Sequence, residues 1–140
     1  MTAAELPQNL IQNLTQVFQT FPELNLAILY GSVAAGTARP DSDIDIAVAI
    51  DSRTPIPYET LLRISSEIGA RTGREAQVRD LSQAQGVFLQ QVLTKGIVVL
   101  QRDSTVRAHL IIRMLDFVED MLPNVRMIRT RNRERFLAGQ

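Results

Sequence analysis

Two aspartates spaced two residues apart are the side chains of this sequence best suited to chemistry. Asp43 and Asp45 open the segment Ile44 to Ile50, whose alternation predicts a β-strand. Side chains two apart in a strand point to one face, so the two carboxylates would lie about 7 Å apart along the backbone. Two ionised carboxylates this close repel unless a cation lies between them, and oxygen ligands favour Mg²⁺ or Mn²⁺. The pair therefore predicts a divalent metal site.

A glycine-serine pair supplies the complementary half. Gly31-Ser32 follows the apolar run LAILY, which we interpret as a buried strand, and ten residues separate Ser32 from Asp43. Glycine lets the backbone approach a ligand, and the Ser32 hydroxyl and the amides of a short helix near 32–35 can donate to phosphate oxygens. Either half alone has an ordinary explanation, a solvated strand end or a plain turn. Together they predict a site for a nucleotide triphosphate and its metal.

The elements around these residues predict an α+β fold. Helical spacing appears from Leu10 to Phe21, after Thr54-Pro55 up to Gly73, and after Asp103 to near Pro123. Ser82 and Gln85 have the form of a capping box, and the helix that they would open ends at Lys95-Gly96. Besides the two strands above, residues 75–81 and 97–100 are predicted to be strands. We therefore expect a small mixed sheet with helices mainly on one face and a C-terminal helical extension.

Composition narrows the class of protein. The 140 residues suit one domain with a hydrophobic core, and 15 basic residues balance 15 acidic ones, so we expect no direct binding to nucleic acid or to a membrane. The sequence has no cysteine, which excludes disulfides and thiolate metal sites. The N-terminal residues lack the pattern of a secretion signal, and no run is long enough to span a membrane. These features predict a cytoplasmic protein.

The Gly31-Ser32 and Asp43-Ile44-Asp45 signature resembles that of the minimal nucleotidyltransferases, a branch of the polymerase-β-like superfamily. The resemblance covers roughly residues 10–103, and more narrowly the chain resembles the MntA-type antitoxins encoded beside a helical HEPN toxin. It implies a small mixed sheet, Mg-ATP as cofactor, and transfer of AMP to a tyrosine of the toxin, which silences its RNase activity. Carried over, Gly31 and Ser32 would hold the outer phosphates, and Asp43 and Asp45 would bind Mg²⁺ and carry catalysis.

One position departs from the pattern that the resemblance implies. Relatives carry a third carboxylate on a later strand, and the residue that we align with it is Gln77. Glutamine cannot accept a proton near neutral pH, so a general base is lost and we expect slow transfer or none, with nucleotide binding retained. Asp80 and Glu75 are candidate substitutes for the third carboxylate. Asp80 is three residues from Gln77, so in a strand its side chain would point to the other face. A bulge could bring in either one.

Three functions therefore remain. The first is an adenylyltransferase antitoxin of a HEPN RNase toxin, with residues 1–103 as the catalytic domain and 104–140 as an extension of that domain or a docking element for the partner. The second is an inactive relative that neutralises the toxin by stoichiometric binding. The third, nucleotide transfer to a small molecule, fits less well because the chain is short for an added substrate-binding domain.

Three further features have an ordinary and a functional interpretation. His109, the only histidine, is more often a helix residue than a ligand. Tyr30 ends a core strand, or it stacks on an adenine. The Arg-rich segment 126–135 is a solvated helix end, or it docks onto an acidic partner or onto RNA phosphates. The apolar residues of the helix before it suggest a protein interface.

Overall fold

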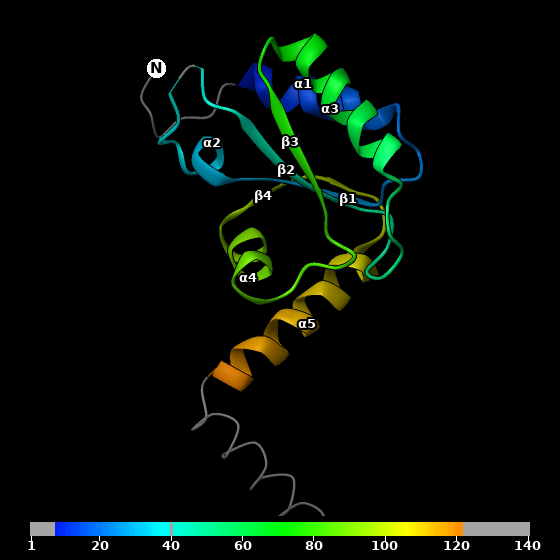
Figure 1. Ribbon diagram of the computed structural model, residues 1–140, viewed down its shortest axis with the longest axis vertical. Helices are drawn as coiled ribbons and strands as arrows, with labels where there is room; N and C mark the ends of the chain where they lie inside the picture. Colours follow the sequence, from blue (N-terminus) through cyan, green and yellow to red (C-terminus); the bar gives the residue numbers. More distant parts are fainter. Residues whose placement is uncertain (1–7, 40, 122–140) are drawn as a thin grey trace, which may run out of the picture.

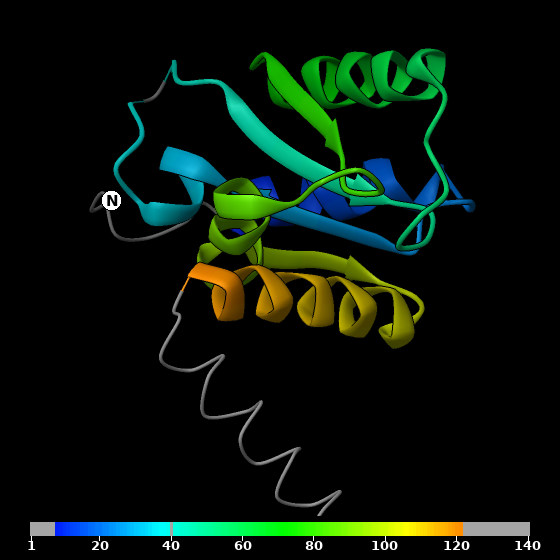
Figure 2. The same cartoon turned by 60° about the horizontal axis from the view of Figure 1, so that its bottom comes forward.

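The computed structural model describes residues 8–39 and 41–121, so the Arg-rich segment 126–135 lies outside the described part. Within these ranges the chain forms four strands and five helices (Figures 1 and 2). In chain order they are α1 (Gln8–Gln19), β1 (Leu26–Tyr30), α2 (Gly31–Ala35), β2 (Ile44–Ala49), α3 (Tyr58–Thr72), β3 (Ala76–Asp80), α4 (Gly86–Lys95), β4 (Ile97–Gln101) and α5 (Ser104–Met121).

The sheet is mixed, as predicted, because the connections between its strands differ in kind. β1 and β2 are antiparallel, and the segment between them holds the Gly-Ser bend and Asp43. β2 and β3 are parallel, so the chain must cross from one end of the sheet to the other, and α3 makes this crossover. β4 pairs antiparallel with the free edge of β1, which gives the strand order β3-β2-β1-β4.

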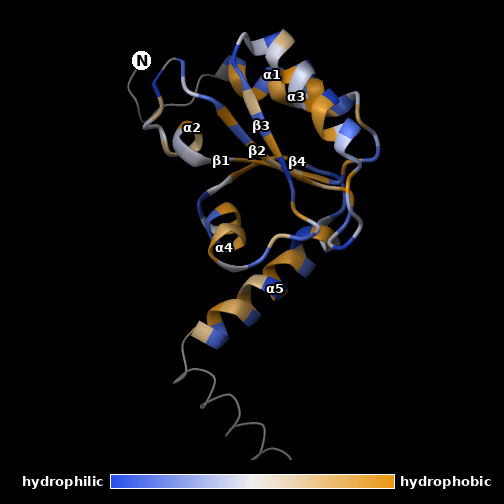
Figure 3. Ribbon diagram, in the orientation of Figure 1, coloured by the Kyte–Doolittle hydropathy of each residue, from blue (hydrophilic) through white to orange (hydrophobic). Residues whose placement is uncertain are grey.

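Helices cover both faces of the sheet, whereas the sequence pattern indicated mainly one. Ala27 and Leu29 of β1 pack in the cluster that contains α1 and α3, and Leu26 and Ile28 pack in the cluster of α4 and α5. Figure 1 shows α1 and α3 on one side of the strands and α4 and α5 on the other, and Figure 3 shows apolar residues along β1 and β2. The predicted fold class is confirmed, but continuous apolar runs in both central strands require cover on two faces rather than one.

Two helix starts differ from their predicted positions. α3 begins at Tyr58 rather than at Thr54-Pro55, because the Asp51 carboxylate accepts the amide of Thr54 at 2.6 Å and keeps that segment in a turn. It ends as predicted at Gly73, whose φ of 70° is the left-handed cap conformation.

The capping box predicted at the start of α4 is absent. Gln85 is itself the residue before the helix and makes no side-chain cap, while the Ser82 hydroxyl donates to Asp80 Oδ2 at 2.8 Å. A short-range hydrogen bond within the β3–α4 loop therefore takes the serine that the pattern assigned to the helix.

Candidate functional site

The bend at Gly31 and the carboxylate of Asp45 lie against each other. Tyr30, the last residue of β1, is the register partner of Asp45 in β2, so the chain turns at Gly31 directly beside that side chain. A Cβ at Gly31 would overlap Asp45 Oδ2. The φ angle of Gly31 is +76°, a conformation that residues other than glycine rarely adopt. Glycine thus permits the close approach that the sequence spacing predicted.

Asp43 and Asp45 share one electrostatic environment. Asp43 immediately precedes β2 and is exposed, and Asp45 is partly buried two residues later. Burial raises the pKa of the Asp45 carboxyl above its usual value and the charge of Asp43 raises it further, while Arg79 opposes both. The repulsion inferred from the spacing is present, and a divalent cation between the carboxylates would relieve it. This donor set of two hard oxygen ligands beside an uncrowded bend fits Mg²⁺ or Mn²⁺.

A cavity of about 420 Å³ opens beside the bend. Its size is typical of ligand pockets, roughly 300–1,000 Å³. The residues that line it come from the end of β1, from α2 and the residues after it, and from α4: Tyr30, Gly31, Ser32, Ala35, Thr37, Gln91 and Lys95. Lys95, in the last turn of α4, gives this cavity a cation that can bind phosphate. The sequence pattern marks Lys95 only as the end of a helix, because its place in the cavity with Ser32 depends on how α4 packs near α2.

Gln77 lies directly opposite Asp45 in the parallel pairing of β2 and β3. Glu75 precedes β3 by one residue and is exposed, and its carbonyl accepts the amide of Ile44 at 2.8 Å. By strand alternation Glu75 belongs to the same face as Gln77. It lies two residues earlier in the chain, on the side of Asp43. Its role as a substitute carboxylate stays a prediction.

Asp80 is placed away from the aspartate pair. Its register partner is Val48, which packs in the cluster on the opposite face of the sheet from Asp45. The Asp80 carboxylate accepts the amides of Ile56 and Ser82, each at 2.9 Å, together with the Ser82 hydroxyl. These bonds join the loop before α3 to the end of β3, so Asp80 stabilises the local structure.

Arg79 is a cation on the same face of β3 as Gln77, and it was not among the predicted site residues. Its guanidinium lies 4.9 Å from the centre of the Phe88 ring, and Phe88 meets Tyr30 edge-on at 5.6 Å. Burial raises the pKa of the Tyr30 hydroxyl, with Arg79 opposing and Asp45 reinforcing the change. The alternation of Gln77 and Arg79 along β3 was the available signal. Tyr30 both ends a core strand and lines the cavity, so adenine stacking stays a prediction.

One arginine fastens the loop that leads to the aspartates. Arg74 donates from Nε and Nη2 to the Ser42 carbonyl at 3.0 and 2.7 Å, and from Nη2 to the Arg39 carbonyl at 3.4 Å. The Ser42 hydroxyl accepts the Arg39 amide at 2.8 Å and tightens the same loop. The approach to Asp43 is therefore held from the beginning of β3.

The family of this chain follows from its sequence and agrees with this geometry. The family described as polymerase beta, nucleotidyltransferase, matches residues 12–105, a range that runs from within α1 past the end of β4 and includes the Gly31 bend, Asp43 and Asp45. The chain belongs to this nucleotidyltransferase family. The predicted resemblance to the polymerase-β-like superfamily is confirmed.

The chain is similar to a curated adenylyltransferase in sequence and to solved toxin–antitoxin structures in fold. The chain is 38% identical over 77 residues to the protein adenylyltransferase MntA of Shewanella oneidensis, an alignment that spans 54% of this chain and 52% of that protein. This chain thus matches about half the length of that curated relative. A toxin–antitoxin crystal structure with AMP-PNP has the same fold, with a TM-score of 0.67, 21% identity, and coverage of 86% and 95% of the two chains.

A second structure extends the likeness of fold. The tri-AMPylated Shewanella oneidensis HEPN toxin in complex with an MNT antitoxin gives a TM-score of 0.63 at 18% identity, covering 88% of this chain and 95% of that chain. In residues 8–39 and 41–121, no helix is long and apolar enough to cross a membrane. The same residues contain no group of three or more histidine, cysteine, aspartate or glutamate side chains suited to a metal.

Proposed function

We propose that this protein is a Mg-ATP-dependent adenylyltransferase that transfers AMP to a tyrosine of a HEPN toxin and so acts as its antitoxin in the cytoplasm. The observation that carries the proposal is the closeness of Asp45 to the Gly31 bend, because Gly31 lines a cavity that is also lined by Lys95. The similarity to an adenylyltransferase named MntA supports the choice of reaction.

Each residue has a defined task in this proposal. Gly31 and Ser32 bind the outer phosphates, the first through its backbone and the second through its hydroxyl, and Lys95 offsets their charge. Asp43 and Asp45 hold the divalent metal, which when bound neutralises charge on the phosphates during transfer. In the proposed transfer the tyrosine oxygen would bond to the α-phosphorus while the bond to the β-phosphate breaks and pyrophosphate leaves. The protein would contribute orientation and electrostatics, with no covalent intermediate of its own.

Gln77 makes the proposed reaction slow. It faces Asp45 from β3, where a carboxylate could accept the proton of the attacking hydroxyl, and its amide cannot do so. Loss of a general base costs roughly 10²–10⁴ in rate. A second function therefore has specific support: stoichiometric neutralisation of the toxin by a protein that binds nucleotide but transfers it poorly or not at all.

For the partner surface we propose α5. Val106 and Leu110 are buried against the sheet, so α5 starts as part of the catalytic domain, but Ile112 and Leu115 are 56% and 50% exposed. This apolar exposure continues to Met121, 63% exposed. Exposed apolar residues along the outer part of one helix are suited to a protein partner.

The deciding experiment is incubation of the protein with the HEPN toxin, Mg²⁺ and ATP labelled at the α- or γ-phosphate, followed by mass analysis of the toxin. A gain of AMP that is lost in Asp43→Ala and Asp45→Ala supports the enzyme. Neutralisation without label that survives both substitutions selects the binding module, and transfer of the γ-phosphate would contradict both.

A further inference from the structure

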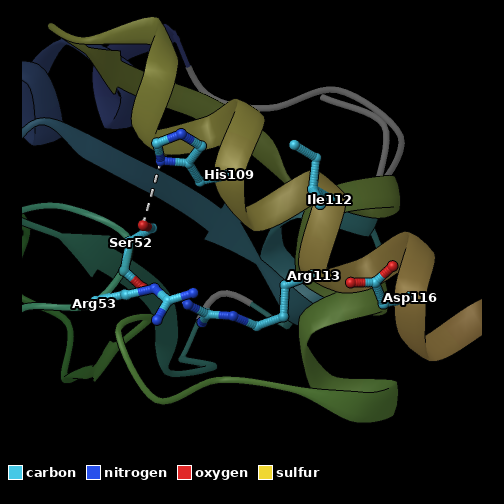
Figure 4. Close-up of a pocket in the computed structure, with 6 residues that line it drawn as sticks. All are labelled: Ser52, Arg53, His109, Ile112, Arg113 and Asp116. Atoms are coloured by element: carbon cyan, nitrogen blue, oxygen red, sulfur yellow. Dashed lines mark hydrogen bonds between the residues drawn. The ribbon is translucent and has the colours of Figure 1, made fainter.

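We propose that a pocket between α5 and the loop after β2 binds a small oxyanion, either a phosphate or a carboxylate group. The pocket has a volume of about 290 Å³ and is shown in Figure 4; its lining residues are Ser52, Arg53, His109, Ile112, Arg113 and Asp116. It lies beyond the last residue of β2, whereas Asp45 is the second residue of that strand, so about 13 Å of strand separates Asp45 from the end at which the pocket lies. The proposal does not depend on the nucleotide site.

The fold builds this pocket from two separate segments. His109, Ile112, Arg113 and Asp116 are three, four and seven residues apart on α5, so they share one face of the helix (Figure 4). The loop that carries Ser52 and Arg53 faces them, and the Ser52 side chain is only 7% exposed. Packing of α5 against the sheet therefore fixes which side chains converge here.

Arg113 is held firmly but keeps its charge. Its Nη1 donates to the carbonyls of Leu81, Ser82 and Ala84 at 3.1–3.3 Å, and its Nη2 donates to the carbonyl of Ser52. A guanidinium has five N–H donors, so Nε and the second hydrogen of Nη2 have no partner within the described residues. Carbonyls orient the group without cancelling its charge, so the site contains a fixed, uncompensated cation.

A second guanidinium faces the first. Figure 4 shows Arg53 and Arg113 extending toward one another, while Asp116 lies on the other side of Arg113 from Arg53. Arg53 is exposed, and it is its backbone amide that donates to the Asp51 carboxylate, at 2.8 Å. Two cations that face each other repel, and an oxyanion between them replaces repulsion with two charge-assisted interactions.

The remaining wall adds donors and limits size. The Ser52 hydroxyl has one long contact, 3.5 Å from His109 Nδ1, so both groups can turn toward a ligand. Ile112 forms an apolar side. Two guanidiniums, a hydroxyl and an imidazole are the donor set that phosphate or carboxylate groups require, and the volume suits a small ligand.

The sole histidine of the chain makes a direct test available. Because only His109 contributes an imidazole signal, ring NMR resonances of the full-length protein report on this pocket and on no nucleotide contact. At constant pH and ionic strength, the resonances are followed while chloride is replaced by inorganic phosphate or by acetate. A saturable shift with either anion supports the proposal and identifies the class of anion. Shifts that do not saturate with either anion overturn it.

Matched variants show whether the arginines carry the effect. Arg53→Gln removes an exposed charge without touching the core, and we expect the apparent Kd for the effective anion to rise about tenfold. Arg63→Gln is the control. Arg63 is also exposed, but it belongs to α3 and its guanidinium lies over the Phe21 ring. The Kd of this variant for the anion should equal that of the wild type. Equal weakening in both variants, or in neither, would contradict a built anion site.

Discussion

Asp45 and Gln77 are register partners across the parallel pair β2 and β3. A side chain at position 77 therefore emerges on the same face as the carboxylate that touches the Gly31 bend. Whatever stands there decides whether the proposed site has two carboxylates or three.

Gln77→Asp should raise the rate of AMP transfer to the toxin. The new carboxylate would stand opposite Asp45, where it can accept the proton of the attacking hydroxyl, and general-base catalysis is worth roughly 10²–10⁴ in rate. Single-turnover transfer of α-labelled AMP measures the change. Gln77→Asn is the control, because it shortens the side chain without adding a base, and a gain of equal size in both variants would refute this assignment.

Gly31→Ala should abolish nucleotide binding and destabilise the fold. The new Cβ would overlap Asp45 Oδ2 while the backbone stays at φ +76°, which costs about 1–2 kcal/mol even without the overlap. Gly73→Ala is a matched control, since φ there is +70° and no atom lies within 4 Å of an added Cβ. Chemical denaturation should show a larger loss for Gly31→Ala, and calorimetry should show a loss of Mg-ATP binding in that variant alone.

Asp45→Asn should separate stability from function. The folded pKa of Asp45 is raised, so its protonated form favours the folded state: this stabilisation is present below about pH 3.8 and is lost as pH rises through the folded pKa. At neutral pH without metal, the variant should therefore be at least as stable as the wild type, and this difference should shrink as the pH falls. Urea unfolding across pH 3.5–7.5 checks the sign. AMP transfer should fall at least a hundredfold, because a metal ligand is lost.

Asp80→Ala should lower stability and spare the site. The substitution leaves the Ile56 and Ser82 amides without their acceptor, which costs about 1–3 kcal/mol of unfolding free energy. The nucleotide affinity of the folded fraction should match that of the wild type. A selective loss of transfer with unchanged stability would instead make Asp80 the substitute carboxylate.

Lys95→Gln should weaken ATP binding about tenfold, since a charge-assisted bond to phosphate is lost. Lys95→Arg should keep most of the affinity because it keeps the charge. Lys95 is the only lysine of the sequence, so acylation of its amine in the presence and absence of Mg-ATP gives a second measurement. Labelling that nucleotide does not slow would count against contact with the phosphates.

Local pattern was sufficient for much of the fold. The apolar runs at 26–30 and 44–50 predicted β1 and β2, and the Gly73 cap predicted the end of α3, because periodicity and glycine conformation act over a few residues. Ser82 was misassigned because a nearby carboxylate competes for its hydroxyl. The distribution of helices over two faces depends on tertiary packing, which no single segment encodes.

Some residues of the candidate site could be predicted from local sequence, and others depend on tertiary packing. Gly31 and Asp45 could be paired from the sequence because a short connection between antiparallel strands brings them together. Lys95 could not, since its place beside the bend depends on the packing of α4, which is distant along the chain. Reading alternate residues of β3 as one face would have found Arg79.

The Arg74 contacts with the Ser42 and Arg39 carbonyls imply that the two aspartates are unequally preorganised. Asp45 is part of a paired strand, so its backbone loses little entropy when an ion binds. Asp43 stands at the end of a loop fastened from outside by one side chain. The entropic penalty of binding a metal is thus concentrated in the loop that leads to Asp43. Substitutions in that loop can change the metal affinity without changing the structure of the sheet.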